Sequence, residues 1–211
     1  LARGAVRRVA FVAPSLAGWA LPLYELALMT ARTVAAAGAD DVRLSLVTPE
    51  ARPLAVFGGD ASAAAERLLA AAGIEFIGAT HVDVRPGAVS VRRDGRSLAV
   101  DRVVALPLLR GPDLQGVPST PSGFVRVDRH GRVPGRRDLY AAGDAVDFPV
   151  KQGGLAAAQA DAVAAHVAAR HGAAIEPAPF HPVLRGMLLT GDAPQFVRSA
   201  GSDPDRGALA T

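Results

Sequence analysis

The sequence predicts an α/β fold built around a parallel β-sheet. One observation is the order of an apolar strand at 8–13, a glycine-containing loop, a helix at 21–37 and a second apolar strand at 42–47. Another is a helical stretch at 61–72 that runs directly into a short strand at 74–77. Strands separated by helices are joined by crossovers, and a crossover places its two strands parallel in one sheet.

Glycines and short polar residues mark the ends of both helices. Gly38 follows the first helix and Gly73 follows the second. Glycine readily adopts the left-handed conformation that often ends a helix, so both positions predict helix C-termini. Asp60 or Ser62 is expected to cap the start of the second helix, because their side-chain oxygens can accept hydrogen bonds from the free N–H groups there.

The chain then passes through three short runs in which apolar and polar residues alternate, at 81–85, 88–92 and 97–101. Alternation with a period of two is typical of β-strands. Pro86-Gly87 and Asp94-Gly95 separate the runs, and Asp-Gly is a favoured hairpin turn. We therefore expect an antiparallel meander, after which 103–105 returns as an apolar strand.

A stretch rich in glycine, proline and serine begins at Gly111 and predicts a connection between two domains. The sequence is therefore divided into domains at 1–110 and 111–211. With 211 residues, half of them hydrophobic, the chain is long enough to bury a core in each.

Four elements are expected in the second domain. The segment 124–128 alternates like a strand, and 139–142 has the composition of a short buried strand. An alanine-rich helix is expected at 154–171, with Gly172 at its end. The tail at 179–191 alternates loosely, as a strand would.

The composition excludes several kinds of chemistry. The sequence contains no cysteine, so it has no disulfide bond, thiolate metal site or redox dithiol. The net charge is +3, and Lys151 is the single lysine among 23 basic residues. Arginines cluster between 126 and 137 without interleaved aromatic residues, which favours a solvated hairpin over a nucleic-acid surface. No metal site is predicted, and no run of about 20 apolar residues predicts a membrane span.

The candidate site lies between 139 and 159. An apolar run ends at Gly143-Asp144, and Gln152-Gly153-Gly154 opens the next helix. Asp144 can accept hydrogen bonds from sugar-like hydroxyls, and the free N–H groups of a helix start attract electron-rich groups. Lys151 stands beside this helix start, where a compact ammonium could fit and a planar guanidinium would not. The alternative interpretations are an ordinary turn with a helix cap downstream, and a lysine retained by drift.

These residues resemble the second flavin-binding motif of the pyridine nucleotide-disulfide oxidoreductase superfamily, in which a short strand ends in Ala-x-Gly-Asp. The resemblance implies that Asp144 binds the ribitol chain of FAD and that the helix N-terminus faces the pyrimidine edge of the flavin. Lys151-Gln-Gly153, followed by Ala-x-x-Gln, is similar to the sulfide:quinone oxidoreductases and type II NADH dehydrogenases. The implied fold is a Rossmann-like nicotinamide-binding-type domain with a parallel sheet and a β-meander, plus a partial FAD-binding domain.

The resemblance extends to two segments of the first domain. The helix start at Pro22 to Glu25 and the loop at Pro107 to Gly111 are similar to segments that lie over the flavin in sulfide:quinone oxidoreductases. The resemblance implies that Glu25 carries protons and that Pro107 contributes to the cofactor site. A carboxylate stabilised by the helix dipole is the alternative interpretation of Glu25.

The dinucleotide-binding fingerprint of the first domain is incomplete. Where the family often has Gly-x-Gly-x-x-Gly, the loop after the first strand retains Gly18 alone. Side chains at the other two positions, and a proline without an N–H at 14, weaken a pyrophosphate site, so NAD(P) binding is left open. Glu50 lies near the place of an acid that could hold a ribose 2′-hydroxyl, with a surface turn as the alternative.

The resemblance implies the C-terminal half of an FAD-dependent oxidoreductase that passes electrons from NAD(P)H or a small reductant to a quinone-like or other acceptor. The sequence offers no glycine-rich βαβ unit for the ADP half of FAD, so an N-terminal half is the expected partner and the isolated chain is expected to be inactive. A non-catalytic nucleotide-binding or interaction module is the alternative. A cytoplasmic location is expected, and a homodimer and peripheral membrane association are left open.

Overall fold

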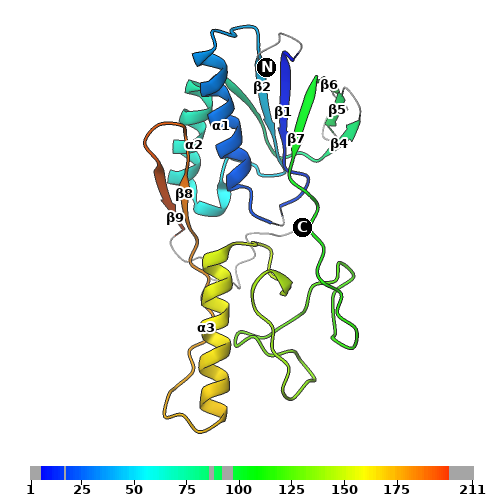
Figure 1. The fold of residues 1–211 in the computed structure, drawn as a ribbon, viewed down its shortest axis with the longest axis vertical. Coiled ribbons are helices and arrows are strands. Elements are labelled where there is room, and N and C mark those ends of the chain that lie inside the picture. Colours follow the sequence, from blue (N-terminus) through cyan, green and yellow to red (C-terminus); the bar gives the residue numbers. More distant parts are fainter. Residues whose placement is uncertain (1–5, 17, 86–87, 92–96, 200–211) are drawn as a thin grey trace. The chain divides into compact units, whose positions relative to one another are not determined.

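The computed structural model describes residues 6–16, 18–85, 88–91 and 97–199, which form two compact units (Figure 1). The first unit contains Ala20–Leu108, the N-terminal segment up to Leu16 and the segment that begins at Arg185. The second unit contains Leu109–Leu184 together with Gly18 and Trp19. The segment from Arg185, placed in the second domain by the sequence, is thus part of the first unit.

A four-stranded parallel sheet forms the centre of the first unit. Its strands lie in the order β3 (Ile74–Ile77), β2 (Arg43–Val47), β1 (Arg8–Val12) and β7 (Arg102–Ala105). All three pairings are parallel, so no two neighbouring strands of this sheet are joined by a hairpin. This sheet confirms the predicted α/β, Rossmann-like fold.

Helices α1 (Leu21–Ala36) and α2 (Gly59–Ala71) connect consecutive strands of this sheet. Right-handed crossovers that step in one direction along a sheet place their helices on the same face. Figure 1 shows α1 and α2 together on one side of the strands. Both helices are followed by the expected glycines, because Gly38 and Gly73 adopt positive φ angles of 62° and 66°.

The predicted N-caps of α2 are wrong. Gly58 is the N-cap residue, and its carbonyl accepts the first helical hydrogen bond, from the Ser62 N–H at 3.0 Å. Gly58 has a φ of 93°, which only glycine adopts readily, so the helix begins directly after it. Asp60 therefore lies in the first turn, and the Ser62 side chain is buried.

Strand β1 lies at the centre of the core of the first unit. Successive side chains of a strand point to opposite faces of the sheet. Ala10 and Val12 pack in a cluster with Val47 and with Val89 of the next sheet. Phe11 lies between them in sequence and points to the other face, where it is also buried.

The predicted meander is confirmed. Strands β4 (Val82–Arg85), β5 (Ala88–Val91) and β6 (Ser97–Ala99) form an antiparallel sheet in sequence order. The turns expected at Pro86-Gly87 and Asp94-Gly95 lie outside the described residues.

A hairpin of strands β8 (Arg185–Leu188) and β9 (Gln195–Arg198) packs against α1. The Glu25 carboxylate of α1 accepts the Leu189 N–H at 3.0 Å. A Cβ added to Gly186 would lie 3.0 Å from Leu21, so a glycine lets the hairpin approach the helix closely. The strand expected over 179–191 is limited to β8.

The second unit has little regular structure apart from helix α3 (Gly153–Arg170) and the 3₁₀ turn η2 (Gly143–Ala145). The strands predicted at 124–128 and 139–142 are wrong. They are reduced to isolated bridges at Val125 and Tyr140, because neighbouring described segments meet them at single residues and no ladder forms. No helix within the described ranges combines the length and hydrophobicity that crossing a bilayer requires.

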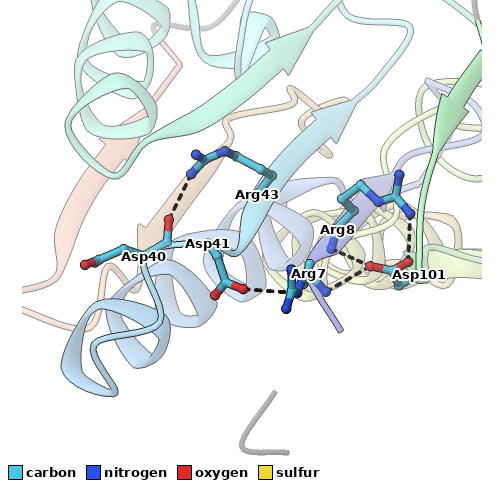
Figure 2. Close-up of polar contacts among 6 residues, drawn as sticks. All are labelled: Arg7, Arg8, Asp40, Asp41, Arg43 and Asp101. Atoms are coloured by element: carbon cyan, nitrogen blue, oxygen red, sulfur yellow. Dashed lines mark hydrogen bonds and ion pairs between the residues drawn. The ribbon is translucent and has the colours of Figure 1, made fainter. Parts of the chain in front are cut away.

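A carboxylate anchors the amino end of the parallel sheet in the first unit (Figure 2). Asp101, just before β7, accepts the N–H groups of Arg7 and Arg8 at 2.9 and 2.8 Å, and the Arg8 guanidinium at 3.1 Å. Arg7 also pairs with Asp41 at 3.1 Å. These hydrogen bonds stabilise the ionised carboxylate and lower the pKa of Asp101 from 3.8 to about 2.

We expect the Asp101 carboxylate to contribute to stability in a pH-dependent way. Because its folded-state pKa is lowered, the contribution is complete above pH 3.8 and is lost as the pH falls toward 2. Asp101→Asn should therefore lower the melting temperature at pH 6, and the difference from wild type should shrink steadily below pH 4. Asp161→Asn, on the exposed side of α3, is the control and should leave the curve unchanged. A constant difference between pH 2 and 6 would contradict this assignment.

Candidate functional site

The Gly143-Asp144 turn of the second unit is fixed to helix α3. The Gly143 N–H donates to the Gln159 side-chain oxygen at 2.7 Å. Gly143 has a φ of 74°, and a Cβ added there would lie 3.4 Å from the Ala156 Cβ. The turn therefore needs glycine for its backbone conformation, and it lies directly beside the first half of α3.

Asp144 is exposed in this turn. No hydrogen-bond donor among the described residues contacts its carboxylate. Its charge acts on Lys151, since Asp144 raises the pKa of that ammonium. An exposed carboxylate without a donor of its own can accept hydrogen bonds from ligand hydroxyls.

The start of α3 is shaped by a glutamine and two glycines. Gln152 is the N-cap residue, and its side-chain oxygen accepts the Leu155 N–H at 2.9 Å. A Cβ added to Gly154 would lie 3.0 Å from that same oxygen, so Gly154 leaves room for the cap. Gly153 and Gly154 are exposed in the first helical turn, where N–H groups have no acceptor within the helix and the helix dipole is positive.

Lys151 is a buried cation just before this helix. Its Nζ donates to the Val146 carbonyl and lies 3.9 Å from the centre of the Phe124 ring. Burial lowers the pKa of Lys151, while the nearby carboxylates of Asp144 and Asp147 act in the opposite direction. The ammonium is therefore held in place by the protein and adds positive potential beside the Asp144 turn.

Gly18, the remaining glycine of the fingerprint, belongs to the second unit. Its N–H donates to the Pro149 carbonyl at 2.7 Å, and its carbonyl accepts the Lys151 N–H at 3.2 Å. Its φ of 121° is open to glycine alone. The backbone of Gly18 therefore supports the segment that carries Lys151, and its N–H is not free for a phosphate.

The surface-turn interpretation of Glu50 is wrong, because the residue is 8% exposed. Its carboxylate accepts the Tyr24 hydroxyl at 2.5 Å and the Thr48 hydroxyl at 3.4 Å. The backbone N–H of Ala55 also donates to it. Burial raises the pKa of Glu50, and burial and the adjacent carboxylate together raise the pKa of Tyr24.

The two other predicted residues of the first unit lie in different surroundings. Glu25 is half-buried and accepts the N–H of Leu189, so in this structure it holds the β8–β9 hairpin. Pro107 is exposed in the loop after β7. The structure thus groups Gly143, Asp144, Lys151 and the start of α3 in the second unit, with Gly18 beside Lys151. Glu25, Glu50 and Pro107 belong to the first unit.

Sequence reasoning noted Gln159 only as the last residue of the Ala-x-x-Gln resemblance and missed that its side chain holds the Gly143 turn. Gln152 and Gln159 are seven residues apart, so two helical turns place them on one face of α3. Gln159 is buried although its neighbours in the helix are alanines. Gln159 is a single amide side chain on the apolar side of an alanine-rich helix, and this pattern could have indicated a buried hydrogen bond.

The residues of the second unit fit the flavin end of FAD. Asp144 offers a free acceptor beside an exposed helix start, as a ribitol chain and an electron-rich ring edge require. The Glu50 carboxylate of the first unit and the Gly18 N–H of the second unit, in contrast, form hydrogen bonds within the protein. Within the described residues, no group of three or more metal-binding side chains is present.

Comparison with models of known protein families shows one match. The model of the pyridine nucleotide-disulphide oxidoreductases matches residues 25–172. No curated protein matches the sequence.

Three solved structures share the fold at low sequence identity. The sulfide:quinone oxidoreductase from Aquifex aeolicus is 19% identical with a TM-score of 0.79, over 90% of this chain and 50% of that one. LpdA from Mycobacterium tuberculosis is 18% identical with a TM-score of 0.60, over 89% of this chain and 39% of that one. The HOCl-induced flavoprotein disulfide reductase RclA from Escherichia coli is 14% identical with a TM-score of 0.60, over 92% and 42%. The chain thus spans half or less of the length of these proteins.

We expect Gln159→Leu to destabilise the second unit. The substitution leaves the partly buried Gly143 N–H without its acceptor, which costs about 1–3 kcal/mol for a buried donor. Chemical denaturation followed by circular dichroism measures the loss. Gln115→Leu, at an exposed glutamine, is the matched control and should change stability by less than about 0.5 kcal/mol. Equal effects of the two substitutions would show that the Gly143 bond does not stabilise the turn.

Proposed function

The chain belongs to the pyridine nucleotide-disulphide oxidoreductase family, and we propose that its second unit binds the flavin end of FAD in an electron-transferring enzyme. The observation that supports this most directly is the free Asp144 carboxylate beside the start of α3. Because the chain spans about half the length of its structural relatives, the activity proposed is that of the whole protein.

Each polar group of the second unit has a part in this proposal. Asp144 accepts hydrogen bonds from the ribitol hydroxyls, and the Gly143 bond to Gln159 keeps the carboxylate in position. The N–H groups at Gly153 and Gly154 stabilise negative charge at the edge of the ring. Lys151 adds a fixed positive potential, since its ammonium is held by Val146 and Phe124.

FAD, when bound, supplies the redox chemistry, and this chain supplies position and electrostatics. Electrons pass from NAD(P)H or a small reductant to a quinone-like or other acceptor. The sequence contains no cysteine, so no dithiol of this chain takes part. In this respect the proposal is closer to the activity named for the Aquifex protein, a sulfide:quinone oxidoreductase, than to that of a disulfide reductase.

A second candidate is an interaction module that keeps the fold without redox chemistry. It is favoured by one observation: the N–H of Gly18, the last glycine of the fingerprint, donates to the Pro149 carbonyl and is not available to a nucleotide. This candidate requires no flavin at Asp144. The flavin content of the protein therefore separates the two.

We expect the protein, expressed from its complete gene, to purify with the visible absorbance of a bound flavin. Asp144→Ala should weaken FAD about 10- to 100-fold, because a hydrogen bond to a charged group contributes about 1.5–3 kcal/mol. Asp147→Ala is the matched control, since Asp147 is also exposed and also acts on Lys151. Its FAD affinity should stay within about threefold of wild type.

Titration of FAD into protein stripped of flavin, followed by flavin fluorescence, measures both affinities. Wild-type protein that neither purifies with flavin nor takes it up would leave the interaction module as the function. Equal losses in the two variants would remove Asp144 from the flavin site without removing the flavin.

A further inference from the structure

The first unit has the fold of a dinucleotide-binding domain, and such domains hold their ligand at the carboxyl ends of the parallel strands. Two features of such a domain usually bind the dinucleotide. N–H groups of the loop after the first strand bind the pyrophosphate, and an acid after the second strand accepts ribose hydroxyls. In the first unit the corresponding residues include Ala13, Pro14 and Glu50.

The polar groups of Glu50 are occupied within the protein. The carboxylate accepts hydrogen bonds from Tyr24, Thr48 and Ala55. The backbone N–H donates to the Thr48 hydroxyl at 3.2 Å, and the backbone carbonyl accepts the Ala79 N–H at 2.7 Å. Glu50 is thereby tied to α1, to the end of β2 and to the segments that follow β2 and β3.

Turning the Glu50 carboxylate toward a ligand would have a large cost. The Tyr24 side chain is 1% exposed, so its hydroxyl would lose its acceptor in a place that water does not reach. The Leu54 N–H donates to the same hydroxyl at 3.3 Å, and Leu54 is itself fully buried with a left-handed φ of 51°. The pair therefore supports a backbone conformation that a non-glycine residue adopts only with help from its surroundings.

Two N–H groups that could serve a pyrophosphate on this unit are also missing or used. The Ala13 N–H donates to the Val47 carbonyl at 2.9 Å and continues the sheet. Pro14 has no N–H. The first two residues after β1 therefore contribute no free donor to a pyrophosphate.

We infer that the first unit binds neither NAD(H) nor NADP(H), and that Tyr24 and Glu50 close the ribose position from inside. Given the proposed function, on which this consequence rests, the electron donor is a small two-electron reductant that does not dock on this unit. The donor loses two electrons and a quinone-like acceptor gains two electrons and two protons, so the exchange balances without a nicotinamide. Tyr24 and Glu50 take no part in the electron transfer and act only by holding the ribose position closed.

The direct test is binding of NADH and NADPH to the protein, followed by nicotinamide fluorescence and by calorimetry without any turnover. We expect no saturation by either up to about 1 mM, the upper end of common Michaelis constants. Saturable binding in the micromolar range that Glu50→Gln abolishes would overturn the inference. Because flavin content is not measured here, a protein without flavin would refute the proposed function and leave this result standing.

A double-mutant cycle tests the role given to the pair. Tyr24→Phe should lower the melting temperature clearly, because it leaves a buried carboxylate without its closest donor. Glu50→Gln should lower it less, since the amide oxygen can still accept from Tyr24. The double variant should be less destabilised than the sum of the two, and Tyr140→Phe, at a phenol bonded to an exposed arginine, is the control.

The two measurements are interpreted together. Absence of nucleotide binding with clear coupling between Tyr24 and Glu50 supports the inference. Absence of binding without coupling would show that the pair is not what closes the site. If Tyr24→Phe does not fold, Glu50→Gln alone decides: it should fold and still not bind NADH.

Discussion

The hydrogen bond between the Tyr24 hydroxyl and the Glu50 carboxylate joins helix α1 to the end of strand β2 inside the first unit. A buried carboxylate is costly unless donors surround it, and here a phenol, a hydroxyl and a backbone N–H do so. Helix α1 and the segment that follows β2, which are more than 20 residues apart in sequence, are thereby joined at the carboxyl edge of the sheet. That edge is where an α/β fold usually leaves its polar groups free for a ligand, so the bond that completes this unit also removes its usual binding site.

In the second unit the acid Asp144 is exposed, whereas Glu50 in the first unit is buried. Asp144 also follows an apolar run, but the hydrogen bond that fixes its turn uses the Gly143 backbone and the Gln159 side chain. The Asp144 carboxylate therefore remains exposed and available. Lys151 is held by a carbonyl and a ring, and no acid in the described part of the chain forms a close ion pair with it. The bond between Gly143 and Gln159 fixes the turn without using the Asp144 carboxylate, so that carboxylate can bind a ligand. This is the physical basis for proposing that the flavin binds to the second unit.

Local pattern was sufficient for the elements that depend on neighbours in sequence. Strand alternation, helix length and glycine-ended helices gave the four parallel strands, α1, α3 and the meander at nearly their observed positions. It failed for the segments 124–128 and 139–142, because an extended segment becomes a strand only when another lies alongside it for several residues. It also failed for the start of α2, where the conformation of Gly58 outweighed the capping preference of Asp60 and Ser62.

The sequence by itself determined the fold class, the family resemblance, the absence of thiol chemistry and the place of the Gly143-Asp144 motif before α3. These follow from periodicity, residue type and short-range spacing, which folding does not change. Only the tertiary structure decided which polar groups are free. Glu50 and Gly18 look as available in sequence as Asp144, yet the donors and acceptors that occupy them, Tyr24 and Pro149, come from residues more than 20 positions away. A hydrogen bond depends on distance in space, and distance in space between such residues is set by the packing of the whole unit.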